Sequence, residues 1–233
     1  MPKLPLLRNF AFVFRELGGP IVLGCISLVT LVFVWIGAEM GAGETRGFDS
    51  AILLALRQPG DLATPIGPQW LKLVMIDLTA LGGGVVLTLV ALVVIGALLV
   101  QRKRAEALFV AVALGGGGAL GIVLKSGYGR PRPDVVTHLV EVTSLSFPSG
   151  HAMNSAVVYL TLATLLARTE PNERVRVYLL VVAISLALLV GVSRVYLGVH
   201  WPSDVVAGWC LGAFWATVGW IVLETSRKPA EVR

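Results

Sequence analysis

The sequence predicts an all-α protein, a bundle of six transmembrane helices. The first observation behind this prediction is composition: of 233 residues, 56% are hydrophobic and 14% are charged, against roughly 25% charged in an ordinary soluble domain. The mean hydropathy is +0.82. A soluble protein of this length has no core large enough to bury so much apolar surface. The composition excludes a disordered chain, a coiled coil, collagen and a disulfide-stapled secreted module. The length fits one domain, residues 1–233.

The second observation is a set of six runs that contain no Asp, Glu, Lys or Arg. Each run approaches or reaches the roughly 17–25 residues that a membrane-spanning helix needs. Backbone polar groups in lipid must be satisfied within the segment, so each run is expected to be helical. The first run is too long for a typical signal peptide, and we interpret it as an uncleaved helix. The expected spans are about residues 20–38, 81–100, 107–124, 148–167, 177–193 and 205–223.

The third observation is the placement of the basic residues, 12 of 19 of which fall in the two terminal segments and the loops after the second and fourth spans. The positive-inside rule places these segments in the cytoplasm. We therefore expect a multi-pass protein of the plasma (inner) membrane with both termini cytoplasmic. Such loops also explain the net charge of +5 without a nucleic-acid partner. The 12 residues are Lys3, Arg8, Arg15, Arg102, Lys103, Arg104, Arg168, Arg174, Arg176, Arg227, Lys228 and Arg233.

The longest connecting segment, residues 39–80, is expected on the outer side. Its stretches Ala51–Arg57 and Trp70–Leu78 are apolar or mixed, which is typical of short helices at the membrane interface. The glycine runs Gly82–Gly84 and Gly115–Gly118 are expected inside the second and third spans, where small residues allow close helix packing.

Polar residues gather in three clusters at the outer ends of the last four spans. In these clusters Lys125, Arg132 and Arg194 are cations without matching acids, and such a set favours an anion such as phosphate. The alternative interpretation is ordinary loop charges. The clusters are Lys125–Pro133, Pro148–His151 and Ser193–Asp204.

The second cluster opens the fourth span. Ser149 is predicted to be an N-cap, and Gly150 allows a ligand to approach the backbone. The free N–H groups of a helix start bind phosphate readily. The alternative is a helix cap with no ligand. His151 lies at the same depth as the third cluster, where a proton donor for a leaving group would be needed.

In the third cluster His200 and Asp204 are four residues apart, and Pro202 suits the first turn of the sixth span. A carboxylate there could accept a hydrogen bond from one imidazole nitrogen and leave the other free as a nucleophile. The alternative is a capping Asp beside an unrelated His. His138 has no cluster around it and is interpreted as a loop residue.

The sequence contains no metal-ligand pattern such as His-x-x-Glu-His or Cys-x-x-Cys, and the outer loops lack a dense group of carboxylates. We therefore expect no metal and no cofactor. The cations would then have to stabilise the charge of the transition state.

Together the three clusters resemble the type 2 phosphatidic acid phosphatase family, integral-membrane lipid phosphatases whose site is related to that of vanadium haloperoxidases. The family pattern is Lys-x6-Arg-Pro, then Pro-Ser-Gly-His, then Ser-Arg-x5-His-x3-Asp. The motifs span Lys125–Asp204, and residues 1–80 carry no fixed position. The matching residues are Lys125, Arg132, Pro133, Pro148, Ser149, Gly150, His151, Ser193, Arg194, His200 and Asp204.

The resemblance implies an outward-facing active site at the helix ends. In it His200 forms a phosphohistidine, Asp204 orients His200, and His151 protonates the leaving group and then activates water. The phosphoryl oxygens would be held by Lys125, Arg132, Arg194, Ser149 and Gly150.

The implied substrate is a lipid phosphate or pyrophosphate. Undecaprenyl pyrophosphate is the first choice, although the motif residues contact phosphate and do not distinguish lipid tails. Phosphatidylglycerophosphate, phosphatidate and a lipid A phosphate are the alternatives. Specificity is expected to lie in residues 39–80 and Asp134–Phe147. A vanadate-dependent haloperoxidase and a non-enzymatic lipid-binding or transport protein are the other classes considered. The sequence does not indicate an oligomeric state.

Overall fold

The computed structural model describes residues 5–225, with side chains described for residues 21–223. The described chain forms helices and one small β-hairpin. The terminal residues Lys3, Arg227, Lys228 and Arg233, which contributed to the predicted orientation, lie outside the described residues, as do the side chains of Arg8 and Arg15. The elements are α1 (Pro5–Ala42), α2 (Thr45–Ala55), β1 (Arg57–Gln58), β2 (Asp61–Pro65), α3 (Gln69–Ala80), α4 (Gly84–Val100), α5 (Arg104–Tyr128), α6 (Gly150–Thr169), α7 (Glu173–Tyr196) and α8 (Pro202–Thr225).

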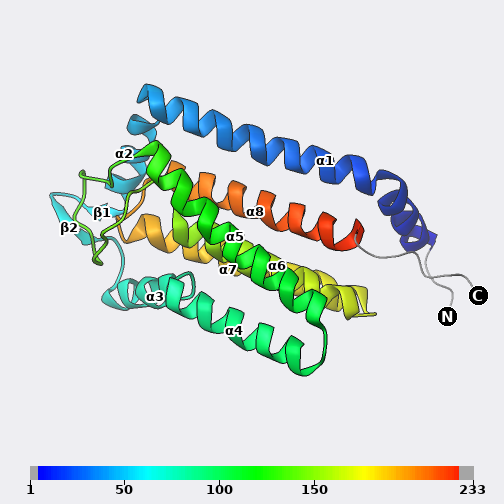
Figure 1. Cartoon of the computed structure of the whole chain (residues 1–233). Helices are drawn as coiled ribbons and strands as arrows, with labels where there is room; N and C mark the ends of the chain where they lie inside the picture. The colour runs from blue at the N-terminus through cyan, green and yellow to red at the C-terminus, as the bar shows by residue number, and fades with distance from the viewer. Residues whose placement is uncertain (1–4, 226–233) are drawn as a thin grey trace, which may run out of the picture.

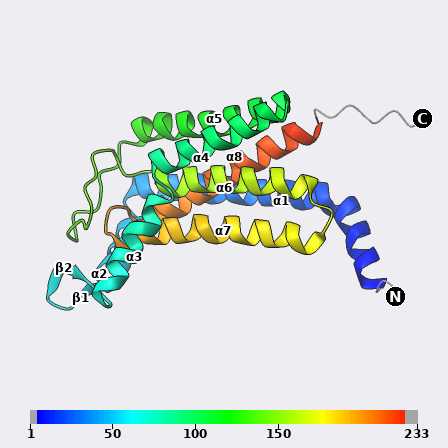
Figure 2. The same cartoon turned by 90° about the horizontal axis from the view of Figure 1, so that it is seen from below.

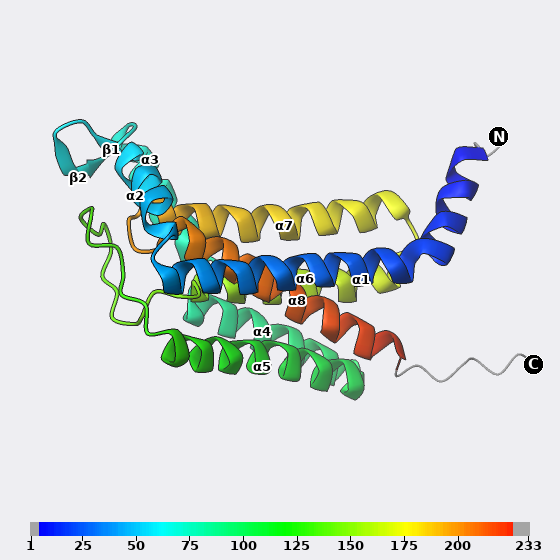
Figure 3. The ribbon, with the colours of Figure 1, turned by 90° about the horizontal axis from the view of Figure 1, so that it is seen from above.

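The long helices lie side by side in an elongated bundle (Figure 1). The hairpin, α2 and the loop between α5 and α6 gather at one end, which we call the hairpin end (Figures 2 and 3). The start of α1 and the end of α8 lie at the opposite end. Helix α6 is central and packs against α4, α5, α7 and α8. Because α5 and α7 end where α6 and α8 begin, the three polar clusters of the sequence meet at the hairpin end.

Five helices are long and apolar enough to cross a membrane, and α3 with α4 passes the same test as a pair bent by 45°. Counted with that pair, the described helices give six candidate spans, which agrees with the predicted six-helix bundle. The second span differs from its prediction, because α4 begins only at Gly84. The expectation that the run Gly82–Gly84 lies inside a helix was wrong: Gly82 and Gly83 form the break. A Cβ on Gly82 would collide with the side chain of Val190 in α7 and lie 3.2 Å from the carbonyl oxygen of His151 in α6, so the chain here passes too close to these two helices for a side chain.

The second glycine run serves close packing, as predicted. A Cβ on Gly116 would lie 2.6 Å from Trp215 of α8, and one on Gly117 would lie 3.1 Å from Val157 of α6. The indole of Trp215 also donates a hydrogen bond to the carbonyl of Ala113 at 2.7 Å. Gly115 and Gly118 have no neighbour within 4 Å at this position. The glycine face of α5 therefore contacts α6 and α8 through two of its four residues.

Residues 39–80 contain the two short helices that the sequence predicted, α2 and α3, and a hairpin that the sequence did not indicate. Strands β1 and β2 pair antiparallel, with Arg57 opposite Pro65. The buried guanidinium of Arg57 donates to the carbonyl of Tyr196 at the end of α7, at 3.0 Å. Helix α2 does more than lie on a surface, because its Asp49 and Leu53 are fully buried. The segment is thus attached to the ends of the bundle helices.

Candidate active site

An open cavity of about 350 Å³ lies at the hairpin end, where the three sequence clusters meet. Its walls come from the last turn of α5, the loop after α5, the first turn of α6, the last turn of α7 and the segment before α8. Ser149 and Asp204 lie behind this wall and do not line the cavity. The other six predicted site residues line it: Lys125, Arg132, Gly150, His151, Arg194 and His200.

His200 stands between Asp204 and the cavity. Its Nδ1 lies 3.4 Å from Asp204 Oδ2, and its Nε2 lies 3.2 Å from an Arg132 nitrogen. The backbone explains this placement, because Gly198 adopts a φ of +74° and ends α7 in a tight turn. Helix α8 then begins at Pro202, as the sequence predicted. Asp204, in its first turn, accepts the backbone N–H of Trp201 at 3.1 Å, which fixes the carboxylate beside the imidazole.

Burial decides the protonation state of His200. The side chain is 1% exposed, and this desolvation lowers the pKa of His200 from 6.5 to about 3, although the neighbouring Asp204 acts in the opposite direction. The imidazole is therefore neutral at neutral pH. A neutral ring with its Nδ1–H toward a carboxylate carries its lone pair on Nε2, where it can accept a hydrogen bond from Arg132 at 3.2 Å.

The three predicted anion-binding cations are held by neutral oxygen acceptors. Lys125 donates to the carbonyl of Leu145. Arg132 donates to the carbonyl of Ser144 at 2.6 Å and to its hydroxyl at 3.0 Å. Arg194 donates to the hydroxyl of Thr79 at 2.9 Å. Within the described part of the chain, none of the three is paired with a carboxylate. Their charges are thus available to an anion in the cavity.

The start of α6 also borders this cavity. Ser149 occupies the N-cap position, as predicted, although its side chain makes no capping hydrogen bond. The backbone N–H of Ser149 donates instead to the carbonyl of Asp204 at 3.0 Å. Its hydroxyl is buried without a hydrogen-bond partner. The first N–H groups of α6 have no helical acceptor and point toward the same end.

Two polar residues near the site were missed by sequence reasoning. Ser146 is fully buried; its hydroxyl donates to Asp204 Oδ2 and lies 3.3 Å from His200 Nδ1. Thr79 holds Arg194 from α3. A serine in a loop and a threonine in a mixed helix carry no distinguishing signal, because their roles depend on contacts across 58 and 115 residues of sequence. In residues 5–225 there is no group of three or more His, Cys, Asp or Glu that could hold a metal ion.

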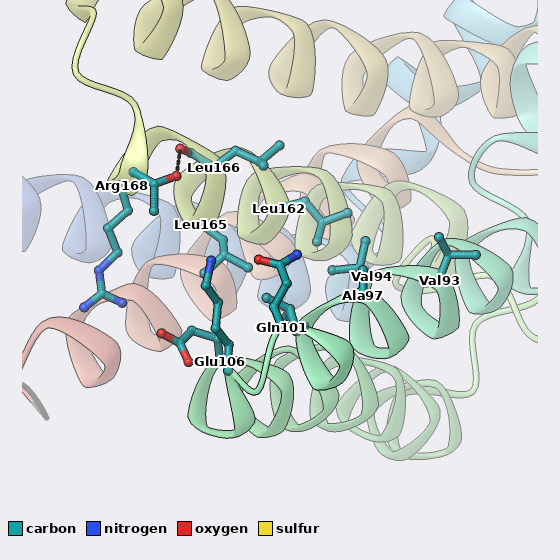
Figure 4. Close-up of a pocket in the computed structure, with 12 residues that line it drawn as sticks. Val93, Val94, Ala97, Gln101, Glu106, Leu162, Leu165, Leu166 and Arg168 are labelled. Carbon is teal, nitrogen blue, oxygen red and sulfur yellow. Dashed lines mark hydrogen bonds between the residues drawn. The ribbon is translucent and has the colours of Figure 1, made fainter.

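A second, larger cavity of about 460 Å³ opens between α4, α5 and α6 at the opposite end of the bundle (Figure 4). Its walls include Val93, Val94, Leu162 and Leu165, and Glu106 lies at its polar edge. None of the three motif clusters reaches it. The chemistry that the sequence predicts belongs to the smaller cavity.

Comparison with known proteins agrees with this geometry. Residues 106–228, more than half of the chain, match the PAP2 superfamily. The chain belongs to this superfamily. The PAP2 protein is 38% identical to phosphatidylglycerophosphatase B of Bacillus subtilis over 189 residues, which cover 78% of this chain and 86% of that protein. It is 44% identical to undecaprenyl-diphosphatase of Sulfolobus acidocaldarius over 80 residues, 34% of each chain.

A solved structure extends the likeness to the fold. The PAP2 protein superposes on the crystal structure of a transmembrane PAP2-type phosphatidylglycerolphosphate phosphatase from Bacillus subtilis with a TM-score of 0.80. The two are 31% identical, and the match covers 88% of this chain and 98% of the other. The resemblance to type 2 phosphatidic acid phosphatases is confirmed. This PAP2 protein is a multi-pass membrane lipid phosphatase.

Proposed function

We propose that this PAP2 protein hydrolyses a lipid phosphate or diphosphate through a phosphohistidine formed on His200, without a metal ion. One observation carries the proposal: a buried neutral imidazole has Nδ1 beside Asp204 and lines a cavity together with three cations that, among the described residues, are not paired with a carboxylate. That arrangement combines a nucleophile with a binding site for the charge on which it acts.

In the first step the Nε2 lone pair of His200 attacks phosphorus, and the bond from phosphorus to the lipid oxygen breaks. His151 enters the step as a protonated imidazolium and gives its proton to that oxygen, because an unprotonated alkoxide or phosphate leaves poorly. Asp204 stabilises the positive charge that develops on the imidazole. In the second step His151 takes a proton from water, the hydroxide attacks phosphorus, and the phosphorus–nitrogen bond breaks. Inorganic phosphate leaves, and both histidines return to their starting states.

The cations and the start of α6 hold the phosphoryl group. Arg132 and Arg194 offer planar forks to its oxygens, and Lys125 adds a point charge. The backbone N–H of Gly150 is placed to add a hydrogen bond where negative charge accumulates. Preorganised donors of this kind usually contribute most to phosphoryl transfer, because little else in the reaction needs catalysis.

The proposed orientation places the hairpin end on the outer face of the membrane and both termini in the cytoplasm. The α4–α5 and α6–α7 connections lie at the opposite end of the bundle (Figure 1). These connections and the adjoining helix turns carry the basic residues that the positive-inside rule expects on the cytoplasmic side, namely Arg102, Lys103, Arg104, Arg168, Arg174 and Arg176. A phospholipid head group would then enter the cavity from the outer leaflet, while its tail stays among the helices.

Among lipid substrates, phosphatidylglycerophosphate is supported by the likeness to phosphatidylglycerophosphatase B over most of both chains. Undecaprenyl pyrophosphate, the first choice from the sequence, is supported by the shorter match to undecaprenyl-diphosphatase. Both present a terminal phosphate to His200, so the site chemistry is the same. Phosphatidate and a lipid A phosphate are the remaining members of the class.

The test is release of inorganic phosphate in detergent with excess chelator, from each of the four lipids. Wild type should release phosphate, and His200→Ala should lose at least about a thousandfold in rate, because the covalent route is removed. His138→Ala is the matched control: this loop histidine bonds the carbonyl of Pro133 and should leave the rate within about threefold. Full activity of His200→Ala would refute the mechanism. Activity that returns only with added metal would refute metal independence.

A further inference from the structure

Behind Asp204 lies a buried chain of charges that the mechanism above does not use. Arg130 Nη1 lies 2.6 Å from Asp204 Oδ1, and Arg130 Nη2 lies 2.8 Å from Asp49 Oδ2. The Arg130 side chain is 10% exposed, and both carboxylates are 0% exposed. The other oxygen of Asp204 faces His200. One oxygen of Asp204 thus lies beside the candidate nucleophile, and the other forms an ion pair with Arg130.

Asp49 also holds the start of α8. Its Oδ1 accepts the backbone N–H of Ser203 at 2.9 Å, and its Oδ2 accepts the Ser203 hydroxyl at 2.6 Å. Ser203 directly precedes Asp204 in the first turn of the helix. A carboxylate from α2 therefore caps α8 across 154 residues of sequence. Arg130 donates to the Ser203 hydroxyl as well, at 2.8 Å, and lies over the ring of Trp201.

The order of charges along this chain is negative, positive, negative. Arg130 alone would form a neutral pair with Asp204 and reduce the negative potential at His200. Asp49 offsets that effect, because its carboxylate shares the same guanidinium. The group of three keeps one net negative charge next to the imidazole. Both the direction and the charge of Asp204 therefore depend on residues that touch no substrate.

We propose that Asp49 and Arg130 are positioning residues: Arg130 fixes the orientation of Asp204, and Asp49 fixes Arg130 and the start of α8 so that Asp204 remains the counter-charge of His200. The inference rests on the proposed function in that it takes His200 as the nucleophile. It assigns a role in the reaction to the outer segment, which carries no motif residue.

The first experiment compares Asp49→Asn and Arg130→Gln with wild type by steady-state kinetics across pH. The matched control is Glu173→Gln, an exposed carboxylate in the first turn of α7, at the opposite end of the bundle. Both test variants should lose about 10- to 100-fold in kcat with KM within about threefold, because binding groups are untouched. The control should match wild type.

The acidic limb of kcat/KM separates positioning from a purely structural role. Loss of a negative charge in Asp49→Asn lowers the pKa of His200 and moves the limb to lower pH. Loss of a positive charge in Arg130→Gln raises that pKa and moves the limb to higher pH. Opposite shifts support the proposal, and shifts of the same sign or no shifts overturn it. The other groups that face His200, and that stay constant in this comparison, are Asp204, Arg132, Arg194, His151 and Lys125.

The second experiment does not depend on the lipid. Orthovanadate, which imitates phosphate in its five-coordinate state, is titrated into each purified protein by calorimetry. Asp49→Asn should bind it at least about tenfold more weakly, and Glu173→Gln should bind it as wild type does. If wild type binds vanadate but releases phosphate from no lipid, the substrate proposal fails while the positioning proposal is still decided by the affinities. Equal affinity of wild type and Asp49→Asn would overturn the positioning proposal.

Arg130→Lys is a conservative variant that keeps the proposal testable if Arg130→Gln or Asp49→Asn does not fold. Lysine keeps the positive charge but loses the fork that reaches both carboxylates. Arg130→Lys should keep the wild-type acidic limb of kcat/KM, because the positive charge remains. Its kcat should fall, because the two-sided contact with Asp49 and Asp204 is lost. A variant with wild-type kcat would show that the fork is not needed and would refute the role of Arg130.

Discussion

Replacing Gly208 by alanine should separate the two halves of the active site by a defined distance. Gly208 lies one turn beyond Asp204 in α8, where a Cβ would be 2.7 Å from the carbonyl oxygen of Ser149 and 3.1 Å from the Cβ of Ala152. An ordinary contact is 3.4 Å or more, so α8 and the start of α6 must move apart by about 0.7 Å. These are the two helices that bring His200 and His151 to one cavity.

The expected loss of activity follows from the displacement of the two helices. A misplacement of about 1 Å between reacting groups costs on the order of 100-fold in rate, so about 0.7 Å should lower kcat by roughly 10- to 50-fold. Overpacking at a helix crossing should also cost about 1–3 kcal/mol of stability. The assay is phosphate release together with thermal unfolding in detergent.

Gly219→Ala in the same helix is the matched control. Its Cβ would lie 3.4 Å from Phe109, an ordinary contact, so kcat and stability should stay near wild type. Wild-type kcat in Gly208→Ala would refute the reasoning, because it would mean that the crossing tolerates a Cβ without moving the site.

Three further results are expected. Ser146→Ala removes a hydrogen bond to the Asp204 carboxylate, an interaction worth about 1.5–3 kcal/mol, and kcat should fall roughly 10- to 100-fold; unchanged kcat would show that the hydroxyl does not matter. Thr79→Val removes the hydroxyl that holds Arg194 and should raise KM about three- to tenfold with a smaller effect on kcat, which a substrate titration checks. Because burial lowers the pKa of His200 to about 3, the unfolded chain binds the proton first, so this contribution to stability is present above about pH 6.5 and is lost as the pH falls toward about 3. In His200→Gln the melting temperature should fall less over that window, and an unchanged slope would contradict the assignment.

The glycine break between α3 and α4 illustrates where a sequence pattern is ambiguous. The run Leu81–Val100 is uniformly apolar and long enough to span, so it predicts one helix. Three successive glycines also weaken a helix, and in this chain the first of them, Gly82, lies where the backbone passes close to Val190 of α7 and the start of α6. Whether the glycines continue the helix or break it depends on the neighbouring helices, and the local sequence contains no information about those neighbours.

In the candidate site, too, some features follow from local sequence patterns and others depend on contacts between distant residues. The eight predicted site residues converge because their motifs lie at the ends of consecutive antiparallel spans, and the apolar runs of the sequence already imply that topology. The sequence indicated no role for Asp49, Arg130, Ser146 or Thr79. Each of these residues acts through a partner that is distant in the sequence. Such contacts leave no periodicity or motif spacing from which they could be predicted.

By itself the sequence determined the membrane class, the six candidate spans, the family and the motif residues of the candidate site, because apolar length and motif spacing are local properties. Only the tertiary structure decided how those residues are oriented: which oxygen of Asp204 faces His200, which oxygens hold the cations, and that α2 caps α8. The physical reason is that orientation is set by hydrogen bonds and packing between elements distant in sequence. These contacts form only when the helices are in place.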